Sequence, residues 1–133
     1  MSNRLMITIL SILLITSSSL SADEPSRFIL TNTRVEPGNM SPLGKVLISC
    51  QVSHPLGPMH IENVAASVHH GGWITTYPVL YDNGTHGDLT PDDGIYSLEI
   101  QAAKTPCEAS IVFHASDKDR NEIESEPVIL VVK

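Results

Sequence analysis

The sequence predicts an all-β fold, a two-layer sandwich of about seven strands, and two observations indicate it. Apolar residues alternate with polar ones or form short runs, and no stretch has the spacing of a helix of useful length. Turn residues such as glycine, proline, asparagine and aspartate interrupt these runs every eight to twelve positions. Short strands at this regular spacing are typical of a sandwich or a barrel.

Seven segments have the patterning of a strand. In chain order they are residues 28–35, 45–52, 61–70, 73–81, 95–100, 107–115 and 127–132. Alternation is clearest in the second and the sixth, where every other residue is expected to face the core: Val46, Ile48, Cys50 and Val52, then Cys107, Ala109, Ile111, Phe113 and Ala115. Pro78 removes a hydrogen-bond donor from the fourth segment, so we expect that strand at a sheet edge or with a bulge. Seven strands in about 110 residues suit an immunoglobulin-like or fibronectin type III-like β-sandwich.

The first residues have the features of a secretory signal peptide. Arg4 provides a positive start, residues 5–15 are almost wholly apolar, and small polar residues lead to Asp23 and Glu24. Cleavage before Ala22 gives a signal peptide over residues 1–21 and a mature domain over residues 22–133. The alternative is a membrane anchor, but the apolar run is shorter than the ~20 residues that span a bilayer. We therefore expect an exported protein that is periplasmic, secreted or at the cell surface.

Net charge limits the partners of the mature domain. The chain carries a formal charge of −7, and loss of Arg4 makes the mature domain more acidic still. No cluster of lysine or arginine follows the signal peptide, and nucleic-acid binding and attachment to anionic membranes both need one. We expect no nucleic-acid partner and no membrane association after cleavage. The sequence also lacks the common nucleophile-elbow, zinc-protease and dithiol motifs, so we expect no enzyme.

The two cysteines, Cys50 and Cys107, form an even pair in an exported chain, which predicts a disulfide. One difficulty stands against it. Cys50 comes late in its strand and Cys107 at the start of its own, and in an immunoglobulin-like sandwich these two strands run in the same direction. The two thiols would then lie at opposite ends, beyond the Cα separation of ~7 Å that a disulfide tolerates.

Residues 79–97 carry a motif that resembles one found in bacterial extracellular immunoglobulin-like modules, approximately L-x-D-D-G-T-H-G-D-x-x-A-G-D-G-x-Y-S. The matching residues here are Leu80, Asp82, Gly84, Thr85, His86, Gly87, Asp88, Asp93, Gly94, Tyr96 and Ser97. Residues 111–121 are similar to the penultimate strand and turn of the same modules, with Arg120 in place of a glycine. The resemblance implies the same sandwich fold and an accessory role in the extracellular space. It assigns no activity, because one fold serves many functions.

The loop within this motif is rich in oxygen-bearing side chains, namely Asp82, Asn83, Asp88, Asp92 and Asp93. Calcium prefers six to eight oxygen ligands, so these five residues are candidate calcium ligands. The alternative is that they accept hydrogen bonds from backbone N–H groups in the turns of the loop. Calcium is the one cofactor that the sequence suggests.

The remaining polar and aromatic residues predict no further site. The six histidines separate toward different ends of the expected sheet, which argues against a shared transition-metal site. Trp73 and Tyr77 could stack on a sugar, although a single tryptophan is more often part of a sandwich core. The sequence thus predicts an exported, non-catalytic binding or structural module with a protein or glycan partner. The alternative is a calcium-stabilised extracellular domain.

Overall fold

The computed structural model describes residues 27–133. The predicted signal peptide, residues 1–21, lies outside the described residues, as does the start of the predicted mature domain. Within residues 27–133 no helix is long and apolar enough to cross a membrane. Residues 27–133 are almost entirely strand, turn and loop, so the predicted all-β fold is confirmed.

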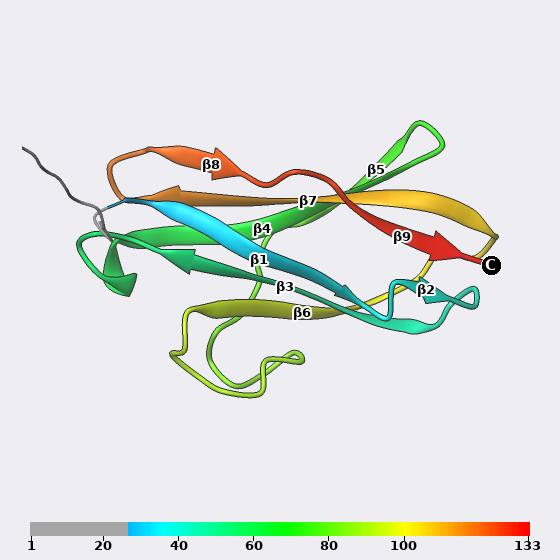
Figure 1. Ribbon diagram of the computed structural model, residues 1–133, viewed down its shortest axis with the longest axis horizontal. Coiled ribbons are helices and arrows are strands. Elements are labelled where there is room, and N and C mark those ends of the chain that lie inside the picture. Colours follow the sequence, from blue (N-terminus) through cyan, green and yellow to red (C-terminus); the bar gives the residue numbers. More distant parts are fainter. Residues whose placement is uncertain (1–26) are drawn as a thin grey trace, which may run out of the picture.

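In this described part of the chain nine strands form two sheets (Figure 1). The smaller sheet has the order β1-β3-β6 and contains β1 (Ile29–Glu36), β3 (Lys45–Ser53) and β6 (Ile95–Gln101). The larger sheet has the order β2-β9-β7-β4-β5, and β8 also pairs with β7. Its members are β2 (Asn39–Met40), β4 (Ile61–His70), β5 (Trp73–Tyr77), β7 (Cys107–Asp117), β8 (Glu122–Glu124) and β9 (Val128–Val132). A 3-10 turn, η2 (Pro58–His60), precedes β4.

The strand order is that of an immunoglobulin-like sandwich. In such folds the second strand pairs with the first and the fifth, and the penultimate strand lies between the third and the last. Here β3 lies between β1 and β6, and β7 lies between β4 and β9, all in antiparallel pairs. The extra edge strand β5 continues the larger sheet beyond β4.

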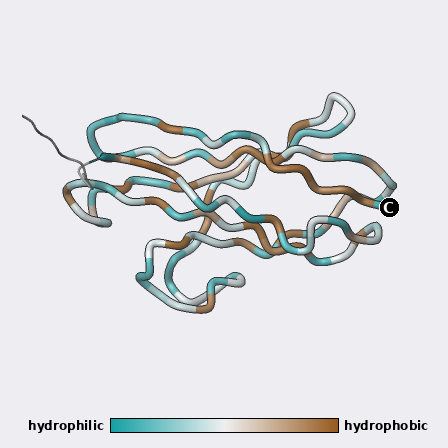
Figure 2. The backbone as a smooth tube through the Cα atoms, in the orientation of Figure 1, coloured by the Kyte–Doolittle hydropathy of each residue, from teal (hydrophilic) through white to brown (hydrophobic). Residues whose placement is uncertain are grey.

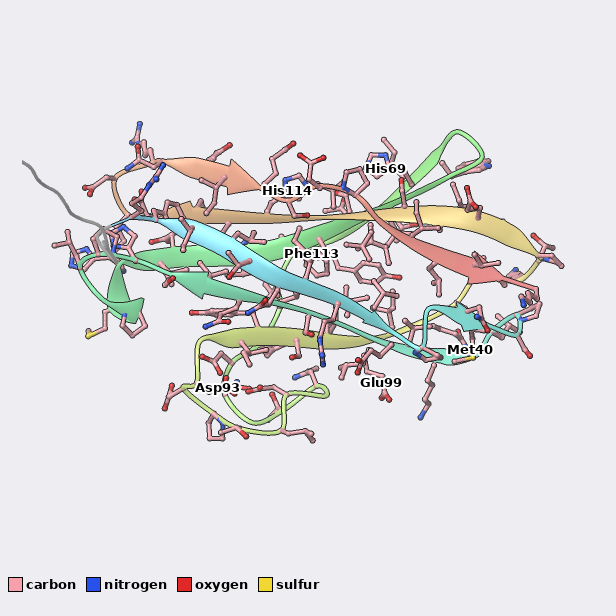
Figure 3. The ribbon with its side chains drawn as sticks, in the orientation of Figure 1. Met40, His69, Asp93, Glu99, Phe113 and His114 are labelled. Atoms are coloured by element: carbon pink, nitrogen blue, oxygen red, sulfur yellow. The ribbon has the colours of Figure 1, made fainter. Side chains whose placement is uncertain are left out.

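The core lies between the two sheets and follows the predicted alternation. Buried residues on β3 face buried residues on β4 and β7, and Phe113 lies between the layers (Figure 3). The predicted inward set on β3 is buried throughout. On β7 four of the five predicted residues are buried, and Cys107 is half-buried at the strand end. Figure 2 shows the resulting apolar stretches along β3, β7 and β9.

The fourth predicted strand, residues 73–81, is wrong in its second half. The strand β5 ends at Tyr77, directly before Pro78. The chain then crosses to the other sheet, where the Tyr81 N–H donates to the Ser97 carbonyl at 2.9 Å and Ser97 returns the bond at 2.8 Å. The reason is that Pro78 has no N–H to continue the pairing. The prediction that this strand lies at a sheet edge is nevertheless confirmed, because β5 is the last strand of its sheet.

The predicted disulfide between Cys50 and Cys107 is wrong, because both thiols are free. Cys50 lies opposite Tyr96 in the smaller sheet, while Cys107 begins β7 and lies opposite Val132 in the larger one. The strands β3 and β7 run in the same direction (Figure 1), so a residue late in one and a residue first in the other lie at opposite ends. Burial raises the pKa of the Cys50 thiol to about 12, which keeps it protonated and unreactive at neutral pH.

Candidate functional site

The acidic loop, residues 82–94, lies along the open edge of β6 and is attached to it (Figure 1). The Glu99 N–H donates to the His86 carbonyl at 2.9 Å, and the His86 ring stacks on Tyr81 with centroids 3.8 Å apart. Gly87 has φ +97 and lies so close to β3 that a Cβ there would stand 2.7 Å from a Leu47 methyl. Glycine at this position therefore allows both the positive φ of the turn and the close approach of the loop backbone to Leu47.

Three of the five predicted calcium ligands come together. One carboxylate oxygen each from Asp82, Asp88 and Asp93 lies within 4.8 Å of the others. Asp88 is only 5% exposed, Asp82 is half-buried and Asp93 is exposed. Figure 3 labels Asp93 on the loop. Three like charges at this separation repel one another, so the arrangement favours either a cation or a bound proton.

Backbone N–H groups also donate hydrogen bonds to two of these three carboxylates. The Gly94 and Asp93 N–H groups donate to Asp82 at 2.9 Å and 3.2 Å, and the Gly84 N–H donates to Asp88 at 2.8 Å. Burial raises the pKa of Asp82, and a hydrogen bond with the Asp93 side chain adds to the increase, while the N–H bonds oppose it. Asp82 and Asp88 thus accept hydrogen bonds from backbone N–H groups of the loop, as the sequence suggested, and both also belong to the group that could hold a cation.

The other two predicted ligands have different roles. The Asn83 side-chain oxygen accepts a hydrogen bond from the Thr85 N–H at 3.1 Å. Asp92 has φ +60 and is exposed; it contributes its backbone N–H, which donates to the Asp82 carbonyl at 2.9 Å. The Asp92 carboxylate does not belong to the group of three.

A cavity of about 490 Å³ lies beside the acidic loop. Val52, Ile61 and Met59 from the β3–β4 side give it an apolar wall, and Asp82 and Asp92 from the loop give it an acidic one. Within the described residues its lining contains no lysine or arginine. The cavity is open to solvent, and Met59 at its rim is 83% exposed.

A second feature is the exposed strand β5. Trp73 is 73% exposed and Ile74 is 62% exposed, so the expectation of a core tryptophan is wrong. The reason is that β5 extends beyond the area that the smaller sheet covers, and Figure 1 shows the β4–β5 hairpin projecting from the body. Tyr77, at the other end of β5, does pack against the core. On the outer face, Ile74, His69 and Ile129 border a shallow hollow of about 350 Å³.

A buried polar pair occupies the end of the sandwich near η2. His54 Nε2 lies 3.0 Å from Asp117 Oδ2, and the two side chains are 4% and 2% exposed. His54 Nδ1 accepts a hydrogen bond from the Leu56 N–H, so Nε2 carries the ring proton and donates to Asp117. The ring also stacks on His60. These contacts join the β3–β4 connection to the end of β7, which is a structural role.

A chain of polar side chains crosses the outer face of the larger sheet. Ser67 Oγ lies 3.3 Å from His114 Nε2, and His114 Nδ1 lies 3.3 Å from Glu124. The order is that of a serine hydrolase triad, but Ser67 lies in β4, which is paired on both sides. The N–H groups of β4 are therefore used by the sheet, and none is left there to stabilise an oxyanion. Only the strand register brings these three residues together, so spacing in the sequence could not reveal them.

Comparison with known proteins adds no assignment to this geometry. No protein-family model matches the chain, and no curated protein matches it.

Proposed function

We propose that this domain is an exported, non-catalytic binding or structural module, and that a protein partner adds a strand to it at β5. The resemblance of residues 79–97 to bacterial extracellular modules supports export and an accessory role. The single observation that carries the proposal is that β5 is unprotected, whereas the other sheet edges within residues 27–133 are each protected. Open sheet edges bind extended chains through main-chain hydrogen bonds.

The protected edges use familiar devices. The strand β1 carries the ion pair Arg34–Glu36 and a register irregularity after Thr31. The acidic loop covers the edge of β6. On the far side of the larger sheet β2 has only 2 residues, and β8 has 3 residues with a glutamate at each end. Charges, bulges, short strands and covering loops all discourage pairing with another chain.

The strand β5 has none of these devices. Its five residues, WITTY, are all uncharged and all favour strands, and four of them are exposed. A two-residue turn of Gly71 and Gly72, both with positive φ, connects it to β4. In such a hairpin the residues next to the turn form a hydrogen-bonded pair, so alternate residues of β5 direct their backbone groups outward. Ile74 and Thr76 therefore offer their N–H and C=O groups at the free edge.

Site-specific photo-crosslinking tests this proposal. A benzophenone amino acid in place of Ile74 is expected to yield a covalent adduct with a protein in the cell that makes this chain. The same substitution at Thr31, on the protected edge of β1, serves as the matched control and is expected to yield little. An additional Thr75→Lys substitution should remove the Ile74 adduct, because a charge on an edge strand opposes strand addition. Equal adducts at Ile74 and Thr31 would contradict the proposal.

A second candidate function, a calcium-stabilised extracellular domain, is favoured by the close approach of Asp82, Asp88 and Asp93. A cation there would offset the repulsion among the three carboxylates. Backbone carbonyls of the loop and water would complete the six to eight ligands that calcium prefers. On this account the ion is structural and holds the acidic loop on β6.

Calorimetry with calcium or with EDTA tests the calcium candidate. Extracellular calcium modules have dissociation constants on the order of 0.1–1 mM. At about 10 mM calcium and the tighter of these values, the ion should add about 2.7 kcal/mol to the free energy of unfolding. We expect the same increase in Asp92→Asn, whose side chain is outside the group of three, and a smaller one in Asp93→Asn. An unchanged melting temperature of the unmodified domain would remove calcium from the account.

A further inference from the structure

We propose that the partner at β5 is a second copy of this chain, paired antiparallel about a two-fold axis that passes beside Thr75. This inference rests on the proposed function, since it names the partner that adds a strand to this edge. Three properties of the edge support it: its hydrogen-bonding groups, its side chains and its lack of charge.

The hydrogen-bonding groups are self-complementary. Ile74 and Thr76 direct their backbone groups outward, as the hairpin register requires. When two copies of β5 pair with Thr75 opposite Thr75, Ile74 of each copy lies opposite Thr76 of the other. Both outward residues of both copies then fall in hydrogen-bonded positions, and no outward N–H of β5 is left unpaired. Such an interface uses the same patch on both subunits, as two-fold symmetry demands.

The side chains are self-complementary in the same register. Trp73 of each copy comes opposite Tyr77 of the other, at a position where opposite side chains approach most closely. Aromatic cross-strand pairs are among those that stabilise antiparallel sheets. Each exposed Trp73 ring thereby gains one aromatic neighbour, the Tyr77 ring of the other copy. The two-fold axis relates the two pairs. Pro78 is no obstacle, because it comes opposite Gly72, outside the paired segment.

The absence of charge on this edge also favours a second copy. The chain has a net charge of −7, yet residues 71–81 contain no charged side chain. A basic partner would find no carboxylate on β5 to pair with, whereas an identical uncharged strand needs none. The remaining charges of the two copies repel one another at long range, and salt screens this repulsion. Association of two copies should therefore strengthen as salt rises, while association with a basic partner should weaken.

Analytical ultracentrifugation of the mature domain across a concentration series tests the inference. We expect a reversible monomer–dimer equilibrium that shifts toward the dimer at higher salt. Thr75→Lys should raise the dissociation constant at least about tenfold, because two like charges then face each other at the axis. Thr75→Glu should do the same. Thr31→Lys, the same change on the charged edge of β1, should leave the equilibrium unaltered.

Mixing the two charged variants makes the test specific to the two-fold register. The equimolar mixture of Thr75→Lys and Thr75→Glu should form dimers that neither variant forms alone, because lysine then faces glutamate. A domain that stays monomeric at every concentration and salt, or a mixture with no rescue, would overturn the second copy as partner. If Ile74 still crosslinks to a different protein, the proposed function stands without this inference. If Ile74 yields no adduct either, both fail.

Discussion

Replacing Phe113 with alanine is expected to lower the free energy of unfolding by about 3–5 kcal/mol. Phe113 is fully buried, lies opposite Ala66 in the sheet, and its ring fills the space between the two layers (Figure 3). Its removal leaves a cavity that small neighbours such as Ala66 cannot fill. A domain of this size has only about 5–15 kcal/mol of stability, so the loss is a large part of the total. Urea denaturation followed by circular dichroism measures it.

Phe113→Leu is the matched control, because leucine keeps the site apolar and fills more of the space than alanine does. It should lose less stability than Phe113→Ala. In both variants the slope of the free energy of unfolding against urea concentration should equal that of the unmodified domain. If Phe113→Ala lowered the free energy of unfolding by less than about 1 kcal/mol, Phe113 would not be part of a well-packed core. The two sheets would then not face each other as described.

Acid is expected to weaken the end of the sandwich where Asp117 lies. The Asn121 side-chain amide is the main cause that lowers the pKa of Asp117 from its ordinary 3.8 to about 2, and bonds from His54 and two backbone N–H groups add to it against the effect of burial. A lowered pKa in the folded state means that the ionised carboxylate stabilises the fold. That stability is fully present above about pH 4 and is lost as the pH falls toward 2.

Thermal melting of Asp117→Asn at pH 7, 4 and 2 checks this expectation. The variant should melt well below the unmodified domain at pH 7, because an amide nitrogen cannot accept the hydrogen bonds that a carboxylate oxygen accepts. The difference in melting temperature should shrink at pH 2, where Asp117 itself becomes protonated. Asp119→Asn, an exposed neighbour in the same turn, should melt like the unmodified domain at pH 7. A difference that is the same at all three pH values would contradict the assignment.

The fold could be predicted from the sequence because burial in a two-layer sandwich follows a period of two. Val46, Ile48 and Phe113 are apolar residues at alternate positions, and each is buried where the alternation places it. The end of β5 could not be predicted as reliably, since alternation continues past Pro78 while the chain changes sheets. The disulfide prediction failed because Cys50 and Cys107, although both have suitable patterning, lie at opposite ends of strands that run in the same direction.

The candidate sites depend on long-range pairing that the sequence does not display. Spacing marked five oxygen-bearing residues in the acidic loop, but only the fold of the loop separates Asp88, which points into the group of three, from Asp92, which does not. Likewise, the sequence of β5 indicates a strand. That β5 is the last strand of its sheet follows only from the order of the strands.

Hydrogen exchange at the amides of β5, followed by NMR as a function of protein concentration, tests the central claim most directly. The Trp73 and Thr75 amides, which pair with β4, report the hairpin itself and should be protected at every concentration. We predict that the Ile74 and Thr76 amides exchange fast in dilute solution and become protected as the concentration rises. In Thr75→Lys they should stay fast throughout. Fast exchange of Ile74 and Thr76 in the unmodified domain at every concentration would contradict strand pairing at this edge.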